Sequence, residues 1–293
     1  MSEAIFGKII EVNEDKRIIA VTHQKKNGYY YMSRGMFKQF MDYFQKDIYI
    51  FLKVKDESRI YKGVKVQNVI SIDKILSPRK NKPTVYYDIS MIKSEIRNLV
   101  NQRRYRLFID FEMSMPPYQN YHHFVSEIIQ VGYVLTDEYG FEIERHQGFI
   151  KPELFPKLSK RTLRFLDLTQ ADVNEGMYYS ELHQQLMAIE KAYHPIVFTW
   201  GKNDKSELKK LNKLHHLPNF VRDMQFVDLL SLHKTYYRLK NDLGLFHAYN
   251  LYAKQDLSEQ KHDALEDALV TRHVFYWFKD VCNHKMHVQL QVD

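Results

Sequence analysis

The chain has 293 residues, of which 44% are hydrophobic, 14% are aromatic and 18 are Gly or Pro. This composition excludes a disordered, collagen-like or coiled-coil chain and is typical of globular domains. The single cysteine, Cys282, excludes a disulfide framework. No run approaches the ~20 apolar residues that span a bilayer, and the first residues lack a secretory signal pattern. We therefore expect a cytoplasmic protein without membrane association.

Charge is distributed unevenly along the chain. Residues 1–104 hold 21 Lys and Arg against 11 Asp and Glu, a net charge of +10, whereas the remainder holds 22 against 25, a net charge of −3. This asymmetry indicates two modules, of which the first is suited to a polyanion such as nucleic acid. A solvated basic face that binds nothing specific is the alternative interpretation.

Residues 1–76 are predicted to form a small basic β domain. Hydrophobic residues alternate as in short strands over 5–12, 17–22, 29–32, 48–54 and 64–72. Between the third and fourth strands, Ser33 is a candidate N-cap for a helix over 33–44. Five strands with a helix after the third have the element order of an OB-type barrel, so this domain is a candidate for nucleic-acid binding.

A linker is predicted over residues 77–86. The segment from Ser77 to Pro83 is polar, basic and bracketed by prolines, which is typical of a connection between domains. Apolar residues three or four apart then predict a helix over 88–100. The second domain is accordingly expected to comprise residues 87–293.

From Tyr105 onward the pattern changes to strands separated by helices. Strands are predicted over 107–113, 127–136 and 141–150, the last two joined by a turn at 137–140. The sequence then predicts, in chain order, helices from about 163 that include 179–193, a strand at 196–200, a helix at 204–215, a strand at 225–228 and helices to 282. A mixed sheet that begins with hairpins and is flanked by helices belongs to the α/β class.

Two carboxylates follow the first apolar strand of this second domain. Asp110 and Glu112 are two residues apart, so on a strand they project from the same face while Phe111 points to the other. Partly buried like charges raise a pKa or hold a cation. The alternative is that the strand end is solvated and the two acids merely face water.

Further candidate ligands lie at the starts of two predicted helices. Asp204 follows the strand at 196–200, at an edge where α/β proteins build sites, although with Glu207 it also resembles a helix cap. Asp267 lies beside the apolar face of the last helix, where a lone carboxylate needs a partner. Just before that helix, His262 can point toward the same place.

Together these residues resemble the DEDDh class of DnaQ-like, RNase H-like 3′-to-5′ exonucleases. The motifs of the class correspond to IDFE at 109–112, WGKND at 200–204 and HDALEDA at 262–268, with the histidine five residues before the last aspartate. The resemblance extends from about Tyr105 to Cys282 and does not include residues 1–85. The Trp-Gly pair before Asp204 and the proline-containing insertion after Glu112 are most similar to the ERI-type branch, whose members mostly act on RNA.

The resemblance implies a metal-dependent 3′-5′ exonuclease that releases nucleoside 5′-monophosphates from a single-stranded 3′ end, with RNA favoured over DNA. It implies two ions, Mg²⁺ or Mn²⁺, with Asp110, Glu112 and Asp267 on the first. Asp110 and Asp204 would hold the second ion, and His262 would accept the proton of the attacking water. The insertion is expected to contact the terminal nucleotide, and the candidate residues are Met113, Ser114 and Phe124. The family commonly has threonine where Ser114 stands.

Two other functional classes fit parts of the pattern. A catalytically silent nucleic-acid-binding or regulatory protein would retain the fold and work through residues 1–76. An endonuclease or transposase on the same type of sheet is disfavoured by His262 at this spacing, a feature of exonucleases by resemblance. The sequence does not indicate an oligomeric state.

Overall fold

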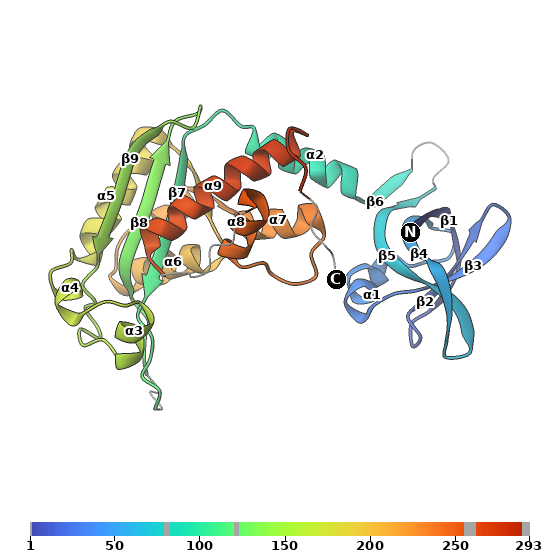
Figure 1. Ribbon diagram of the computed structural model, residues 1–293, viewed down its shortest axis with the longest axis horizontal. Coiled ribbons are helices and arrows are strands. Elements are labelled where there is room, and N and C mark those ends of the chain that lie inside the picture. Colours follow the sequence, from blue (N-terminus) through green and yellow to red (C-terminus); the bar gives the residue numbers. More distant parts are fainter. Residues whose placement is uncertain (1, 79–82, 120–122, 255–261, 289–293) are drawn as a thin grey trace. The chain divides into compact units, whose positions relative to one another are not determined.

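The computed structural model describes residues 2–78, 83–119, 123–254 and 262–288, and Figure 1 shows the course of the chain. The chain forms two compact units, unit 1 (residues 1–95) and unit 2 (residues 96–293). No helix within the described ranges is both long and apolar enough to cross a lipid bilayer.

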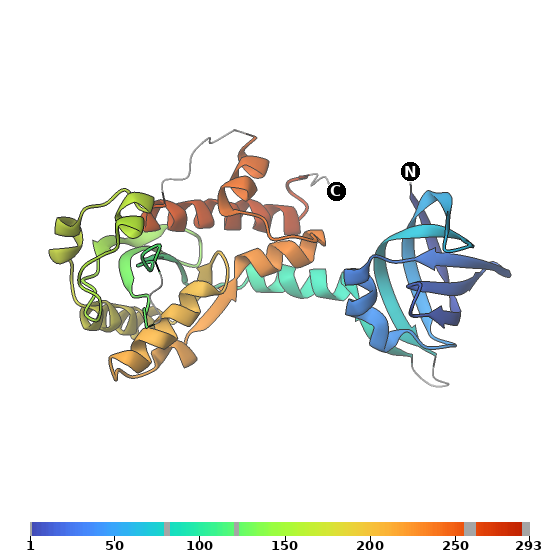
Figure 2. The same ribbon diagram turned by 90° about the horizontal axis from the view of Figure 1, so that it is seen from below.

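Unit 1 is a closed five-stranded barrel with one additional strand. Strand β1 pairs with β2 and β4, β2 with β3, and β4 with β5, all antiparallel, and a parallel pairing of β3 with β5 closes the ring (Figure 2). This is the barrel that the element order predicted. Its elements are β1 (Ser2–Asn13), β2 (Ile18–His23), β3 (Lys26–Tyr31), α1 (Arg34–Phe40), the 3₁₀ turn η1 (Met41–Tyr43), β4 (Tyr49–Tyr61), β5 (Val64–Ser77) and β6 (Thr84–Asp88).

The strands and helix of the barrel follow from the alternation and the cap seen in the sequence. Ile5 and Ile9 of β1 point inward and are buried in the core of unit 1, as are Ile50 and Leu52 of β4. The predicted N-cap is confirmed, because the hydroxyl of Ser33 accepts a hydrogen bond from the backbone of α1.

The predicted linker at 77–86 requires a correction. Its last residues belong to β6, which pairs antiparallel with β5 and so continues the sheet of unit 1. Tyr87 packs edge-on against Phe40, with 4.9 Å between ring centroids, and Asp88 forms an ion pair with Lys74 at 2.8 Å. The prolines therefore bracket a hairpin connection, and the boundary between the units lies at 95/96 rather than at 77–86.

Unit 2 is a five-stranded mixed sheet between helices, in the strand order β11-β10-β7-β8-β9. Strand β8 is antiparallel to both β7 and β9, whereas β10 is parallel to both β7 and β11. The predicted α/β class is confirmed. Helix α2 (Ile89–Val100) crosses the boundary at 95/96. The elements after it are β7 (Arg106–Met113), β8 (Ile128–Thr136), β9 (Glu142–Phe149), α3 (Lys160–Phe165), α4 (Gln170–Asn174), α5 (Tyr179–Tyr193), β10 (Ile196–Thr199), α6 (Asn203–Leu214), η2 (Phe220–Arg222), β11 (Gln225–Asp228), α7 (Leu229–Tyr237), α8 (Leu245–Ala253) and α9 (Ala264–Cys282).

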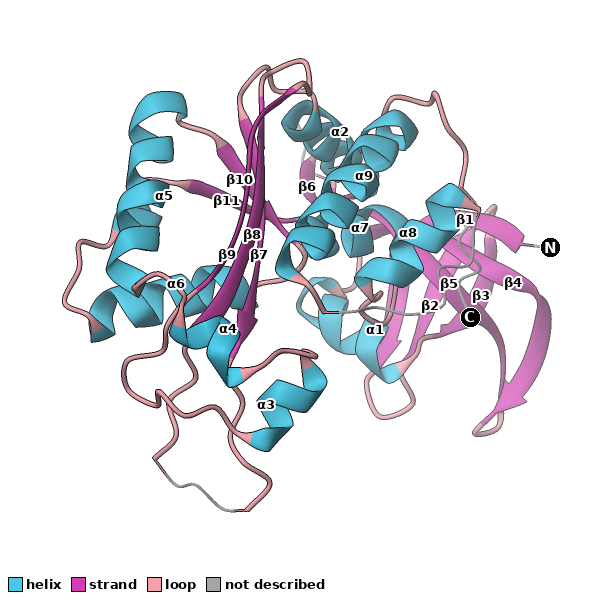
Figure 3. Ribbon diagram, turned by 60° about the vertical axis from the view of Figure 1, so that its left-hand side comes forward, coloured by secondary structure: helices cyan, strands magenta, loops and turns pink. Residues whose placement is uncertain are grey.

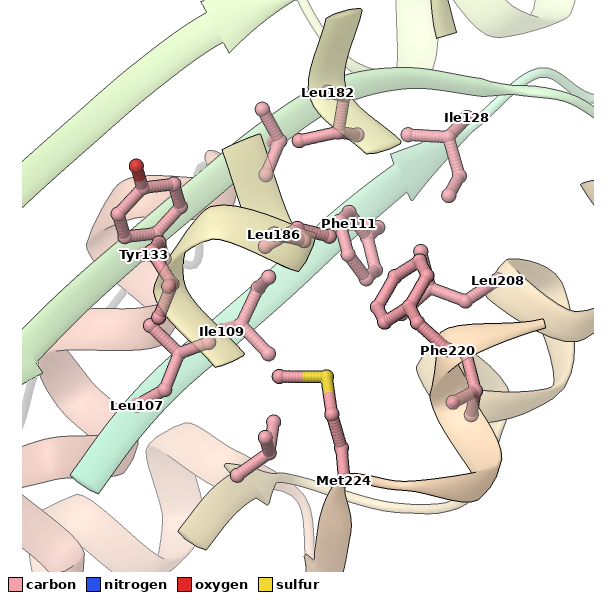
Figure 4. Close-up of a cluster of buried hydrophobic side chains, with 14 of the residues drawn as sticks. Leu107, Ile109, Phe111, Ile128, Tyr133, Leu182, Leu186, Leu208, Phe220 and Met224 are labelled. Carbon is pink, nitrogen blue, oxygen red and sulfur yellow. The ribbon is translucent and has the colours of Figure 1, made fainter. Parts of the chain in front are cut away.

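The two faces of this sheet are covered by different helices, with α5 and α6 on one side and α9 on the other (Figure 3). Figure 4 shows Leu107, Ile109 and Phe111 of β7 in the core that α5 and α6 cover. The alternate residues of β7 point the other way, and the ring of Phe108 lies 5.4 Å from that of Phe275 in α9. Asp110 and Glu112 share this second face with Phe108, so they point toward α9.

The pairing of β6 with β5 predicts which fragment of the barrel is more stable. A fragment of residues 1–76 lacks β6 and loses both the Tyr87–Phe40 contact and the Lys74–Asp88 ion pair, whereas residues 1–95 keep them. We expect the shorter fragment to melt more than about 5 °C lower, because a loss near 1 kcal/mol shifts the melting temperature of a domain of this size by that much. Thermal unfolding followed by circular dichroism measures the difference, and equal melting temperatures would contradict it.

Candidate active site

Strand β7 presents two acidic side chains toward the N-terminal end of α9. Asp110 and Glu112 are half-buried, and across the antiparallel ladder they lie opposite Gly132 and Gln130 of β8. Between them, Phe111 is buried on the other face of the sheet. The solvated strand end considered as an alternative is therefore not what forms, because both acids lie beneath a helix.

Three residues hold the start of α9 against the sheet beside these acids. A Cβ at Gly132 would overlap the backbone of Ala264 and Leu265, so only glycine permits this close approach. The side chain of Gln130 accepts a hydrogen bond from Ala264 N–H at 3.3 Å and donates one to Asp263 at 3.1 Å. Asp263 is the N-cap of α9, and its side chain accepts a hydrogen bond from Glu266 N–H.

This docking brings the last two candidate residues to Glu112. Asp267 lies in the first turn of α9 and is buried, with 6% of its surface exposed. Ligand atoms of Glu112, His262 and Asp267 all lie within 4.8 Å of one another. Residues distant in the sequence, from β7 and from the start of α9, thus form one cluster.

Asp204 joins the same site from α6. Its position is not that of a cap, because Lys202 is the N-cap of α6 and Asp204 lies within the first turn. Its side chain is 5% exposed and accepts hydrogen bonds from the backbone N–H groups of Asp204 itself and Phe111. Asp204 is close enough to Asp110 to disfavour the ionisation of that carboxyl. The capping interpretation is wrong, and the structure places Asp204 beside the other acids.

The electrostatics of the site are those of like charges taken out of water. Burial is the largest cause that raises the pKa of Asp110 well above its usual range, followed by the charges of Asp204, Asp267 and Glu112. Burial together with the nearby aspartates raises the pKa of Glu112 to about 8. The pKa of Asp204 rises to about 7, again mainly by burial, although its backbone hydrogen bonds oppose the shift.

His262 is placed as a neutral imidazole at the rim of the cluster. Burial lowers its pKa, which favours the uncharged form able to accept a proton. Its backbone has a φ of 50°, a left-handed conformation that turns the chain into the cap of α9. The imidazole lies 4.3 Å from the ring of Phe165 in α3, measured between ring centroids, so an aromatic contact supports its orientation.

The donor set of this cluster fits hard divalent cations. Asp110, Glu112, Asp204 and Asp267 offer carboxylate oxygens, the ligands that Mg²⁺ and Mn²⁺ prefer. The mutual repulsion that raises the pKa values of Asp110 and Glu112 is the condition that a bound cation relieves. Because the acids converge from three elements, β7, α6 and α9, they can surround a cation rather than contact it from one side.

The predicted substrate contacts are less well supported than the acids. Alternation along β7 places Met113 with Phe111, and it packs against the core on the face opposite the acids. The hydroxyl of Ser114 is buried and accepts a hydrogen bond from Glu127 N–H at 3.0 Å, which fixes the insertion to β8. Phe124 is half-buried and lies 5.1 Å from the ring of Phe155. Residues 120–122 of the insertion lie outside the described ranges.

Three residues of the site were not singled out from the sequence. Gln130 and Gly132 position α9, and Phe165 contacts His262. A signal for the first two was present, because a glutamine and a glycine interrupt an otherwise apolar strand that is buried throughout. No local pattern distinguished Phe165 from the other aromatic residues, since it meets His262 only in the folded chain.

Comparisons with known proteins agree with this geometry. The family model described as Exonuclease (RNase_T) matches residues 107–275, all within unit 2. Among curated proteins, the chain is 32% identical over 172 residues to "Probable 3'-5' exonuclease KapD" of Bacillus subtilis, a match that covers 58% of this chain and 82% of the relative.

Solved structures with the same fold are also nucleases. The nuclease domain of 3'hExo, described as a DEDDh family member bound to rAMP, matches with a TM-score of 0.54 and 20% identity, over 64% of this chain and 97% of that one. A 3'-exonuclease described in the 3'-end specific recognition of a histone mRNA stem-loop matches with a TM-score of 0.53 and 18% identity, over 65% and 69%. At these identities the likeness shows the fold.

The raised pKa of Glu112 predicts how stability depends on pH without metal. Folding raises this pKa from 4.5 to about 8. The protonated carboxyl therefore contributes its full share to the free energy of unfolding below pH 4.5, and this contribution is lost as the pH rises toward 8. In EDTA, the free energy of unfolding should therefore fall between pH 5.5 and 8, and Glu112→Gln should remove about 1–2 kcal/mol of that fall. Urea unfolding measures it. Glu175→Gln, at an exposed site, is the control, and equal pH dependence in all three proteins would contradict the prediction.

The close approach at Gly132 predicts a positioning effect. Gly132→Ala should force α9 away from β8, lower the free energy of unfolding by about 1–3 kcal/mol and displace His262 and Asp267. A displacement near 1 Å costs about 100-fold in turnover. Gly148→Ala in β9 is the matched control, because its Cβ would meet the ends of side chains that can move. Equal turnover in the two folded variants would contradict this role for Gly132.

Proposed function

The chain belongs to the exonuclease (RNase_T) family and is a 3′-to-5′ exonuclease of the DEDDh class, and from this premise we propose that it removes nucleotides one at a time, as 5′-monophosphates, from the 3′ end of single-stranded nucleic acid. The observation that carries the proposal is the convergence of Glu112, His262 and Asp267, with Asp110 and Asp204 beside them. A base and a set of cation ligands in one cluster are what hydrolysis of a phosphodiester requires.

The four acids are proposed to hold the divalent cations. Asp110, Glu112 and Asp267 would share one, and Asp110 and Asp204 the other. When bound, such cations neutralise charge that develops on the attacking and leaving oxygens and make water a better nucleophile. The contribution of the protein is to keep the ligands in place, because Gly132 and Gln130 fix α9 to β8, which pairs with β7.

His262 is proposed as the general base. Its neutral ring accepts a proton from the attacking water, whose oxygen forms a new bond to phosphorus while the bond from phosphorus to the 3′ oxygen of the preceding nucleotide breaks. The last nucleotide then leaves with its phosphate as a 5′-monophosphate, and the shortened chain regains a 3′ hydroxyl. Contact with Phe165 keeps the imidazole directed at the acids during this step.

RNA is proposed as the favoured substrate. Two of the structural neighbours are described with a ribonucleotide or an RNA, rAMP in one and a histone mRNA stem-loop in the other. The Trp-Gly pair before Asp204 and the insertion after Glu112, which resemble the branch that acts mostly on RNA, support the same preference. A catalytically silent binding protein is the less favoured alternative, since all five residues are present and lie together.

Loss of activity in single variants tests the assignment. We expect Asp204→Asn and His262→Ala to reduce the rate by at least about 100-fold while folding normally, because a general base alone contributes about 10²–10⁴ in rate. EDTA should abolish the activity of the wild type. The assay follows 5′-labelled RNA and DNA oligomers of one sequence, single- and double-stranded, with Mg²⁺ or Mn²⁺, and identifies the released nucleotides by chromatography.

Matched variants separate a catalytic loss from a general one. Asp280→Asn near the other end of α9 and His287→Ala beyond it remove the same groups outside the cluster and should retain full activity. Cleavage of a circular oligomer would contradict an exonuclease, and faster digestion of DNA would contradict the proposed preference. A wild type that is inert with both cations would favour the silent protein.

A further inference from the structure

The net charge of the protein resides entirely in unit 1. Residues 1–95 hold 18 Lys and Arg against 11 Asp and Glu, a net charge of +7, whereas residues 96–293 hold 25 of each. The unit without the acidic cluster is therefore the one whose charge favours a polyanion. Net charge alone does not define a site, so the arrangement of the cations on the barrel decides whether one exists.

Four basic side chains gather around two tyrosine rings in contact where the barrel closes. We call this set the Arg–Tyr cluster. The rings of Tyr31 in β3 and Tyr61 in β4 lie 4.4 Å apart, and a guanidinium nitrogen of Arg17 donates to both hydroxyls, at 3.0 and 3.3 Å. The guanidinium of Arg59 lies over both rings, at 4.9 and 5.2 Å. The cluster comprises Lys16, Arg17, Tyr31, Arg59, Tyr61 and Lys62.

Two turns meet at this cluster. The ammonium group of Lys16, in the β1–β2 turn, donates to the backbone carbonyl of Lys62, in the β4–β5 turn, at 3.3 Å. Asn68 of β5, which pairs with Tyr31, accepts a hydrogen bond from Arg59 at 3.0 Å and fixes its guanidinium. The planar cation is thus held in place before any ligand arrives, which lowers the entropic cost of binding.

The cations of the cluster are not neutralised by the protein. Within the described part of the chain, none of Lys16, Arg17, Arg59 and Lys62 is ion-paired with a carboxylate, and Arg17 Nε is buried without a hydrogen-bond acceptor. Elsewhere on the barrel, Lys8 is paired with Asp47 and Lys74 with Asp88, each at 2.8 Å. The β1–β2 turn also carries two exposed acids, Glu14 and Asp15, and neither forms an ion pair with these cations.

Two of the cations occupy positions that favour glycine. Arg17 has a φ of 51° and Lys62 a φ of 48°, both in the left-handed region, where a side chain costs roughly 1 kcal/mol. Strain of this kind persists where the surroundings or a function require the residue. At Lys62, which is exposed and precedes Gly63, nothing in the packing requires a long basic side chain.

We propose that the Arg–Tyr cluster is a binding site for single-stranded nucleic acid, separate from the acids of unit 2. Arg17, Arg59 and Lys62 contact phosphates, and the guanidinium plane of Arg59, backed by Tyr61, offers a surface on which a base stacks. Binding of an acidic protein would require cations but no planar surface, so the guanidinium plane of Arg59 over the two rings favours nucleic acid. The alternative is a purely structural role, in which the cluster only closes the barrel.

Fluorescence anisotropy on the full chain tests the site. The probes are 5′-fluorescein-labelled U20 and dT20, titrated in EDTA at several salt concentrations so that binding is read without hydrolysis. We expect Arg59→Ala with Lys62→Ala to weaken binding about tenfold or more and to reduce the slope of log K against log salt by about 1.4, the value for two lost phosphate contacts. Lys38→Ala with Lys46→Ala removes the same charge outside the cluster and should change affinity by less than about twofold.

A conservative variant separates stacking from charge. Arg59→Lys keeps the charge and loses the plane, so it should weaken oligonucleotide binding while it leaves the salt slope and the binding of inorganic polyphosphate unchanged. This variant carries the test if the double alanine variant fails to fold. Equal losses in the cluster and control variants, or wild-type affinity in the cluster variants, would overturn the proposal. Neither readout requires cleavage, so an inert active site would leave this result intact.

Discussion

Mutual repulsion among carboxylates is the constraint on which unit 2 depends. Asp110 and Glu112 lie out of water beside Asp204 and Asp267, and their raised pKa values record the cost of burial first and of this repulsion second. In a flexible chain the acids would move apart. They stay together here because the sheet packs on an apolar core with one face and on α9 with the other. Because α9 packs closely on Gly132 of this sheet, the folded core also keeps the acids of α9 and β7 in position. A bound divalent cation would relieve this repulsion.

The two units divide the requirements of acting on a polyanion. Unit 2 has no net charge and gathers four of its acids in one cluster, where negative charge favours cations but disfavours a nucleic acid. Unit 1 carries the positive charge of the whole protein, and the cations of the Arg–Tyr cluster surround the rings of Tyr31 and Tyr61. Affinity for a polyanion and hydrolysis of it are therefore assigned to different side chains, and each can be removed without the other.

Local sequence patterns predicted the residues of the acidic cluster better than they predicted the elements and contacts around it. The spacing of Asp110 and Glu112 on a strand fixes their common face, and the spacing of His262 and Asp267 across a helix start fixes theirs, so both pairs could be inferred. Strand β6 was missed because its evidence is a pairing with β5, and prolines nearby resemble those of a linker. For Met113, the substrate contact stays a prediction, and the structure shows only that its side chain packs against the core with Phe111.

Cation binding tests the central claim most directly. Mn²⁺ can be titrated into the full chain at pH 8 and the bound fraction followed by electron paramagnetic resonance, with Asp110→Asn as the variant, because Asp110 is the acid assigned to both ions. The account predicts two Mn²⁺ per wild-type chain and a loss of both sites in the variant, which nevertheless folds. Equal Mn²⁺ occupancy in the two proteins would contradict it.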